Sequence, residues 1–183
     1  ARYGIELWEV LIKNGNQFGL TPYGTEAMHV LRAERGFIIV GQETDGTVSP
    51  IDLGMDWIIS KKKKDFIGKR SLERASMKQN DRKELVGLLS DDPNTVIPEG
   101  AHAIDEKDLE LEEKNILGHV TSSYFSSNCK RSIAMALIKN GRARKGNKLV
   151  IPLLNGDKIK AKIVNPVFFD PNGVRRNGIW FSK

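Results

Sequence analysis

The feature that most constrains the fold is a set of short apolar runs in the second half of the chain, each bounded by turn-forming residues. The run 158–164 alternates strictly, because Ile159, Ala161 and Ile163 fall on one face and lysines fall on the other. Such alternation predicts a strand with one buried and one solvated face. Four further runs have strand character, so the expected strands are 85–90, 117–122, 132–138, 148–154 and 158–164.

The connections between these runs indicate an antiparallel barrel. The pair Asn155-Gly156 predicts a two-residue hairpin, since both central positions of a type I′ turn need positive φ. Closing a sheet of short strands removes its exposed edges, so we expect a closed or nearly closed β-barrel. Two prolines and a glycine interrupt the acidic segment 91–115, and we expect that segment to be an excursion from the barrel.

The first part of the chain carries helical patterns. Residues 3–14 place their apolar side chains on one helical stripe, and Thr21-Pro22 offers an N-cap and a first-turn proline for a second helix over 22–35. The remaining elements expected are a surface loop at 41–50 that is a candidate for function, a short strand at 57–60 and a third helix at 68–77. The fold class predicted is α+β, with domains at 1–80 and 81–183 and a boundary near 78–84.

Composition excludes several classes of protein. Of 183 residues, 39% are hydrophobic and 28% charged, which is typical of a globular protein, and the apolar runs are too short to span a membrane. The single cysteine, Cys129, forbids an internal disulfide and favours an inert thiol in a reducing, cytoplasmic compartment. Three scattered histidines predict no metal site. Since the chain opens without Met or a signal segment, we expect it to be part of a longer polypeptide.

The net charge of +6 is patterned along the chain. Residues 61–84 carry ten Lys or Arg against four acids, whereas residues 91–113 carry nine acids against one lysine. A solvated basic face is the simplest interpretation of 61–84. The alternatives are a docking surface for an acidic partner subunit, a polyanionic ligand tail and nucleic acid, although nucleic acid is not an expected partner.

Three residues are candidates for binding a ligand. Arg32 and Glu34 lie near the end of the second predicted helix, at a spacing that points them about 200° apart, so we expect one in a cleft and the other on the surface. An arginine that only stabilises the helix C-terminus is an equal alternative. Tyr124, followed by Phe125, either stacks on a planar ring or plugs the barrel mouth, and plugging is favoured. The sequence contains none of the common nucleotide, hydrolase or metalloprotease motifs.

Several ordered motifs resemble the folate-binding aminomethyltransferase family, which includes the T-protein of the glycine cleavage system. They are Leu-Arg-Ala-Glu-Arg-Gly at 31–36, the segments 47–57 and 65–72, Gly-His-Val-Thr-Ser-Ser-Tyr-Phe-Ser at 118–126 and Ile-Ala-Met-Ala-Leu at 133–137. Within this family, residues 19–42 and 166–171 are most similar to the branch formed by α subunits of heterotetrameric sarcosine oxidases. The resemblance implies that 1–80 is the C-terminal portion of a folate-binding domain and that 81–183 is the family's C-terminal barrel.

The resemblance also implies a function. The expected role is to bind tetrahydrofolate, which receives the one-carbon unit of oxidised sarcosine and becomes 5,10-methylenetetrahydrofolate. It places Arg32, Glu34 and Tyr124 at matching motif positions as folate-binding residues and places no catalytic residue in this chain. The family's pterin-contacting acid lies upstream of Tyr3, and Met28 stands where aminomethyltransferases carry an arginine.

Partners and further cofactors follow from the same resemblance. The expected partners are β, γ and δ subunits, with FAD, FMN and NAD bound elsewhere in the complex. Two alternatives stay open. One is a flavin-free, folate-dependent aminomethyltransferase or demethylase, and the other is a non-catalytic binding module that uses the basic segment 61–84.

Overall fold

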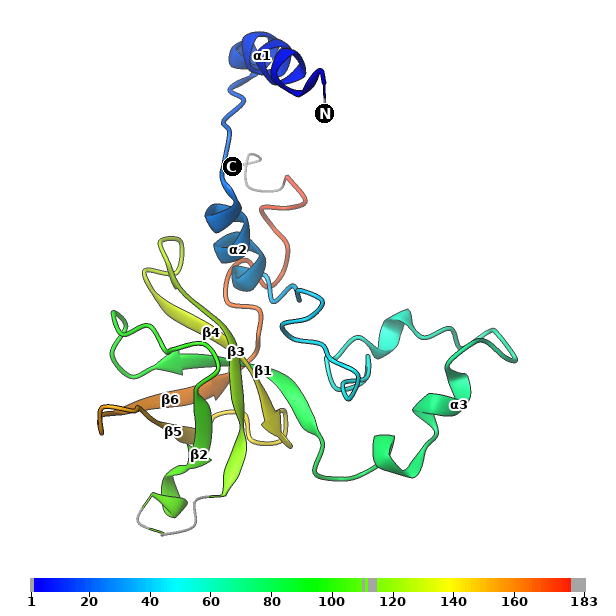
Figure 1. Cartoon of the computed structure of the whole chain (residues 1–183), viewed down its shortest axis with the longest axis vertical. Helices are drawn as coiled ribbons and strands as arrows, with labels where there is room; N and C mark the ends of the chain where they lie inside the picture. The colour runs from blue at the N-terminus through cyan, green and yellow to red at the C-terminus, as the bar shows by residue number, and fades with distance from the viewer. Residues whose placement is uncertain (1, 110, 112–114, 179–183) are drawn as a thin grey trace.

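The computed structural model describes residues 2–109, 111 and 115–178. Its centre is a closed antiparallel barrel of six strands in the order β1-β4-β3-β2-β5-β6, which the pairing of β1 with β6 closes (Figure 1). The strands are β1 (Lys83–Ser90), β2 (His102–Asp105), β3 (Ile116–Ser126), β4 (Arg131–Lys139), β5 (Lys148–Pro152) and β6 (Lys158–Val164). The predicted fold class, helical segments followed by an antiparallel barrel, is confirmed.

The barrel interior is filled by the apolar face of each strand. Along β6 the burial alternates as the sequence predicts, with Ile159, Ala161 and Ile163 inside and the lysines outside. Small and large side chains share the interior, which lets the layers interdigitate in a narrow barrel. The buried interior residues are Val86, Leu88, Ile97, Ala103, Leu117, Val120, Ala134, Ala136, Ile138, Leu149, Ile151, Ile159, Ala161 and Ile163.

A second apolar cluster lies on the outer wall of the barrel. It is formed by Leu85 of β1 and by Ile133, Met135 and Leu137 of β4, whose side chains point away from the interior. The helix α2 (Thr25–Glu34) covers it with Ala33, and the partly buried Ile38, Val48 and Leu53 of the following segment pack against it. Part of the first 80 residues is therefore packed onto the barrel wall.

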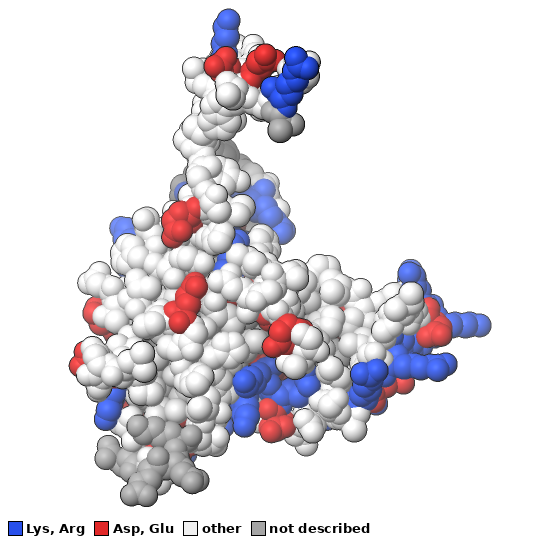
Figure 2. All heavy atoms as spheres, in the orientation of Figure 1, with Lys and Arg blue, Asp and Glu red and all other residues white. Residues whose placement is uncertain are grey.

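Two segments project from this body (Figure 1). The helix α1 (Gly4–Gly15) stands away from the barrel and has no buried residue, so its apolar stripe, including Leu7, Trp8 and Leu11, is exposed. The second projection is an arm over residues 61–78 that carries the short helix α3 (Lys69–Leu72). Figure 2 shows Lys and Arg side chains gathered on this arm. In the part of the chain that the structure describes, no helix is long and apolar enough to cross a bilayer.

A partly buried ion pair between Arg82 and Asp52 anchors the arm to the barrel. The guanidinium of Arg82 donates to both oxygens of the Asp52 carboxylate, with Nε 2.8 Å from Oδ1, and Ser49 donates its backbone N–H and its hydroxyl to the same carboxylate at 2.7 Å. Arg82 also donates to the backbone oxygens of Thr47 and Ser76, each at 2.7 Å. These bonds join the loop before the arm to the strand after it.

Three elements predicted in the first part of the chain are wrong in detail. The second helix starts at Thr25 with Gly24 as its N-cap, so Thr21-Pro22 does not begin it. The predicted strand 57–60 is instead a 3-10 turn, η2 (Asp56–Ile58). The predicted helix 68–77 is broken into α3 and the 3-10 turn η3 (Ala75–Met77). Neither α3 nor η3 has a buried residue, and short helices depend on packing for their stability.

Two predictions about the barrel are also wrong. The acidic segment is not a mere excursion, because it supplies β2 to the barrel wall and Ile97 to the interior. The loop between β5 and β6 is longer than a two-residue hairpin. The last ladder pair is Pro152 with Lys158, and the backbone N–H of Leu153 bonds to Asp157 O at 2.8 Å.

Candidate functional site

A polar network lies where the end of α2 meets the outer wall of the barrel, and Arg32 is its centre. Its Nη1 atom is 3.0 Å from Oε2 of Glu43 and 3.1 Å from the backbone oxygen of Phe37. Its Nη2 atom is 2.5 Å from Ser122 Oγ and 3.2 Å from Gln42 Oε1. The Glu43 side chain has no solvent exposure and that of Arg32 only 9%. A carboxylate so deeply buried needs a charged partner, and Arg32 is that partner.

A β-bulge in β3 brings Ser122 into the network. Val120 pairs with Ala136 and faces the interior, whereas Ser122, two residues later, pairs with Met135 and faces the outer wall. In a regular strand, residues two apart share a face, and the extra residue Thr121 reverses that rule. Thr121 donates its hydroxyl to the Met135 oxygen at 3.1 Å, which stabilises the bulge.

The bulge also determines where Tyr124 lies. Its ring packs on the outer cluster, with the Arg32 Cζ atom 5.9 Å from the ring centroid and the His29 ring edge-on at 6.4 Å. Burial raises the pKa of the Tyr124 hydroxyl, the neighbouring Glu99 acts in the same direction, and Arg32 opposes both. The prediction that Tyr124 plugs the barrel mouth is therefore wrong, because the change of face turns it outward.

Glu99 links this network to the acidic segment. One of its carboxylate oxygens accepts from the backbone N–H of Ser123 at 3.1 Å, and the other accepts from Gln42 Nε2 at 3.4 Å. Two carboxylates, a guanidinium, a phenol and an amide thus converge on one patch of the barrel wall, with the imidazole of His29 beside the phenol.

Glu34 has a different set of partners. Its carboxylate accepts from Ser126 Oγ at 2.6 Å and from Asn128 Nδ2 at 2.9 Å, and its backbone oxygen accepts the N–H groups of Phe168 and Phe169. The prediction that either Arg32 or Glu34 lies on the surface is wrong, since both side chains are buried. The last turn of α2 lies between β3 and the segment after β6, so opposite sides of the helix are both covered.

The network leaves one donor without a partner. Among the described residues, the buried Nε of Arg32 has no hydrogen-bond acceptor. A buried donor without an acceptor destabilises the folded protein, so a ligand that supplies a hydrogen-bond acceptor to Arg32 Nε would remove that penalty. No group of His, Cys, Asp and Glu residues that could hold a metal ion occurs in the described part of the chain.

Arg32 and Tyr124 were identified from the sequence, whereas Gln42, Glu43 and Glu99 were not. The loop 41–50 was a functional candidate because of its turn formers, and this is the signal that could have pointed to Gln42 and Glu43. Glu99 lies among nine acids, and the sequence does not distinguish it from the other eight.

Two family models match this chain. Residues 1–63 match the GCVT N-terminal domain, and residues 83–170 match the glycine cleavage T-protein C-terminal barrel domain. The second match spans all six strands of the barrel described above. The chain belongs to the glycine cleavage T-protein family.

Comparison with individual proteins shows which members of the family this chain resembles. Sarcosine oxidase subunit alpha of Corynebacterium sp. (strain P-1) is 49% identical over 96% of this chain, and that of Rhizobium meliloti (strain 1021) is 38% identical over 96%. An aminomethyltransferase of Thermoanaerobacter pseudethanolicus is 31% identical over 93%. This chain is therefore homologous to enzymes. It spans only 18% of the length of the two oxidase subunits and 44% of that aminomethyltransferase.

A solved structure shares the fold. The glycine cleavage system aminomethyltransferase T from Bartonella henselae superimposes with a TM-score of 0.76 over 92% of this chain and 44% of its own. Its sequence identity of 24% supports the fold alone.

Proposed function

We propose that this chain is the tetrahydrofolate-binding C-terminal part of a sarcosine oxidase α subunit. Folate binding is a property of its family, and the 49% identity to a sarcosine oxidase subunit alpha favours that branch. The observation that carries the proposal is the Arg32 network, which offers an orphaned buried donor, two carboxylates and an aromatic ring on one patch.

These groups suit the chemistry of a reduced pterin. Such a ring carries amide and amidine groups along one edge and presents a flat face, so it needs both donors and acceptors and a side chain on which to lie. Arg32 and Tyr124 are the proposed contacts. Glu34 is fully engaged with Ser126 and Asn128, so it contributes by holding the end of α2 against β3.

Tetrahydrofolate supplies the nucleophilic nitrogens that take up the one-carbon unit of oxidised sarcosine, giving 5,10-methylenetetrahydrofolate. The residues of this chain would bind and orient the pterin. The acid that handles the proton would come from a part of the protein upstream of Tyr3. Oxidation would require flavin held elsewhere in the complex, so FAD, FMN, NAD and the β, γ and δ subunits belong to this proposal.

The test is a calorimetric titration of the complete α subunit with 5-formyltetrahydrofolate. We expect Tyr124→Leu to weaken binding by roughly tenfold or more, since aromatic stacking and a hydrogen-bonding hydroxyl are both lost. Phe125→Leu is the matched control, because Phe125 is the neighbouring aromatic residue on the opposite face of β3 and is 45% exposed. Equal affinity of the two variants, or no binding by the unaltered protein, would contradict the assignment.

The same preparation separates the alternatives. Folate binding without oxidation of sarcosine in the presence of the partner subunits would favour a flavin-free aminomethyltransferase or demethylase. Tight polyanion binding that falls steeply with salt, with no affinity for folate, would favour a binding module that uses residues 61–84.

A further inference from the structure

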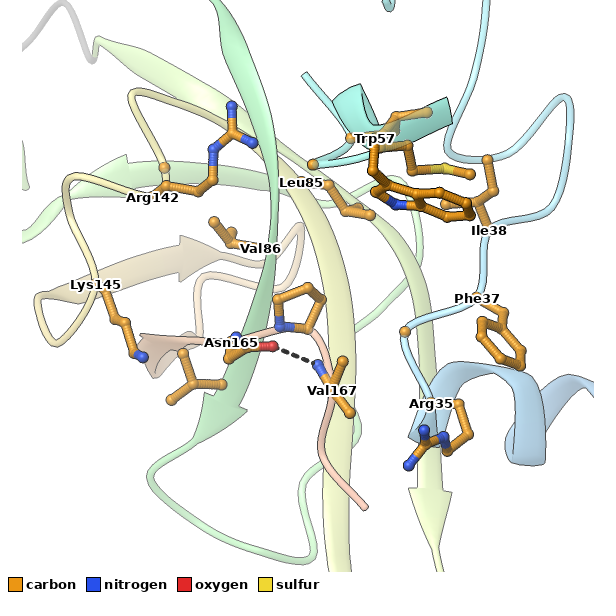
Figure 3. A pocket seen from close by; sticks show the side chains of 17 residues that line it. Arg35, Phe37, Ile38, Trp57, Leu85, Val86, Arg142, Lys145, Asn165 and Val167 are labelled. Atoms are coloured by element: carbon orange, nitrogen blue, oxygen red, sulfur yellow. Dashed lines mark hydrogen bonds between the residues drawn. The ribbon is translucent and has the colours of Figure 1, made fainter. Parts of the chain in front are cut away.

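A cavity of about 540 Å³ lies on the barrel wall beside the Arg32 network. The two have only Phe37 in common, which offers its backbone oxygen to Arg32 and its ring to the cavity. It is bounded by the segment after α2, by β1, by the turn after β4 and by the segment after β6 (Figure 3). Its volume is within the usual range for small-molecule sites.

The walls of this cavity are mainly apolar. Leu85 forms part of its floor, and Figure 3 shows Trp57, Ile38 and Phe37 together on one side. Trp57 is 74% exposed and Phe37 is 59% exposed. Exposed aromatic rings beside a hollow gain free energy when an apolar ligand covers them.

The opposite side of the cavity is cationic. Arg142 and Lys145 lie across from Trp57 in Figure 3, and Arg35 lies at the lower edge. None of the described residues that line the cavity is acidic. Arg35 and Arg142 are paired with carboxylates outside the lining, Asp170 at 3.4 Å and Glu84 at 2.6 Å. Among the described residues, the Lys145 ammonium has no such partner.

A second cavity, of about 570 Å³, adjoins the first. The two share Lys145, Val164, Asn165 and Val167, so Lys145 stands at their junction. The second cavity is lined by Arg131, whose Nη2 donates to Ser90 O at 2.6 Å and whose buried Nε has no acceptor among the described residues. An unpaired cation and an orphaned guanidinium donor therefore line two neighbouring cavities, and none of the described residues that line them is acidic.

We propose that the first cavity is a binding site for an amphipathic carboxylate, with its apolar body against Trp57 and Ile38 and its anionic group at Lys145. Apolar walls with one lysine that lacks a carboxylate partner favour a small aromatic or aliphatic carboxylate. A polyanion would need several available cations, and Arg35 and Arg142 are already paired with Asp170 and Glu84. The side chains that would hold this ligand differ from those of the proposed folate site, so either assignment stands without the other.

The experiment is a calorimetric titration of the complete protein with 2-naphthoate, with 2-naphthalenemethanol as the uncharged control ligand. Lys145→Gln removes the charge from an exposed side chain. The matched control is Lys162→Gln, which removes an exposed lysine of β6 that lines neither cavity. We expect Lys145→Gln to weaken naphthoate binding by roughly fivefold or more, to leave naphthalenemethanol unchanged and to leave 5-formyltetrahydrofolate binding unchanged. Lys162→Gln should change none of them.

A second variant tests the apolar half of the site. Met55→Trp places a larger side chain in the lining and should weaken both naphthalene ligands alike. The proposal is overturned if the unaltered protein does not bind naphthoate, if naphthoate and naphthalenemethanol bind equally, or if Lys145→Gln behaves as Lys162→Gln does. Naphthoate binding that Met55→Trp leaves unchanged would overturn the location.

Discussion

At the scale of single residues, the buried carboxylate of Asp52 shows how one ion pair joins distant parts of the chain. Burial alone would raise the pKa of Asp52, but the hydrogen bonds from Arg82 and Ser49 outweigh it and lower that pKa below its ordinary value. The side chain of Asp52 is only 4% exposed, so its charge has little access to water if Arg82 is lost.

The lowered pKa predicts a pH dependence of stability. Asp52 is ionised more readily in the folded than in the unfolded chain, so its contribution is fully present above its unfolded pKa of about 4. It is lost as the pH falls through the lower folded-state pKa. We expect Asp52→Asn to cost about 3 kcal/mol at pH 7 and to flatten the stability profile below about pH 4, as measured by urea unfolding between pH 2.5 and 7.

Glu84→Gln is the control for this experiment. Glu84 pairs with Arg142, whose side chain is 43% exposed, so its loss should cost less than about 1 kcal/mol. An equal cost for both substitutions would show that burial does not determine the contribution of Asp52.

The residues that form the candidate site could be predicted from the sequence only in part. Arg32 and Tyr124 were candidates from their motif positions, but the contact between Arg32 and Glu43 could not be derived from helical or strand spacing. The eleven-residue separation is bridged by an irregular loop, and only the folded loop shows which acid returns to the helix.

At the scale of elements, β3 is the strand on which the barrel and the candidate site both depend. Its bulge turns Ser122 and Tyr124 toward α2, and its glycine permits close contact with β4. A Cβ atom added at Gly118 would overlap the backbone oxygen of Leu137. Since both groups are backbone or fixed to it, neither can move without displacing a strand.

Gly118→Ala should therefore destabilise the protein, by about 3 kcal/mol, because the added methyl group overpacks a barrel wall. Thermal unfolding followed by circular dichroism would measure the loss. Gly46→Ala is the control, because nothing lies within 4 Å of a Cβ atom built at that loop glycine. A Gly118→Ala protein as stable as the control would mean that β3 and β4 separate more easily than their packing indicates.

Five of the six barrel strands were predicted from the sequence, either by alternation or as short apolar runs between turn formers, and β2 was not. The β6 segment was recognisable because lysines mark its outer face. The β2 segment has only four residues and lies within an acidic stretch, so no periodicity reveals it. The bulge in β3 was equally invisible, because an inserted residue changes the face without changing the composition.

At the scale of the whole molecule, the barrel and the N-terminal segment share a core. The outer cluster around Met135 is covered by Ala33, Ile38, Val48 and Leu53, all of which precede the predicted domain boundary near 78–84. The domain boundary at residue 80 therefore remains a prediction, and truncation of the chain at that point can test it.

A chain of residues 81–183 should keep the barrel interior but expose the outer cluster. We expect its thermal midpoint to lie about 10 °C or more below that of the full chain, since each kcal/mol corresponds to several degrees in a domain of this size. A chain of residues 22–183 is the control. It lacks α1, which buries no residue, and should unfold close to the full chain. Equal midpoints for all three chains would show that α2 does not stabilise the barrel.

Closure of the barrel also limits how other proteins can assemble with this chain. Each of the six strands pairs with two neighbours, so no strand of the barrel has an edge that is free over its whole length. Closure of the described barrel therefore disfavours recognition by β-augmentation. We therefore expect a subunit that binds to the barrel to recognise mainly side chains, so that single surface substitutions can change its specificity.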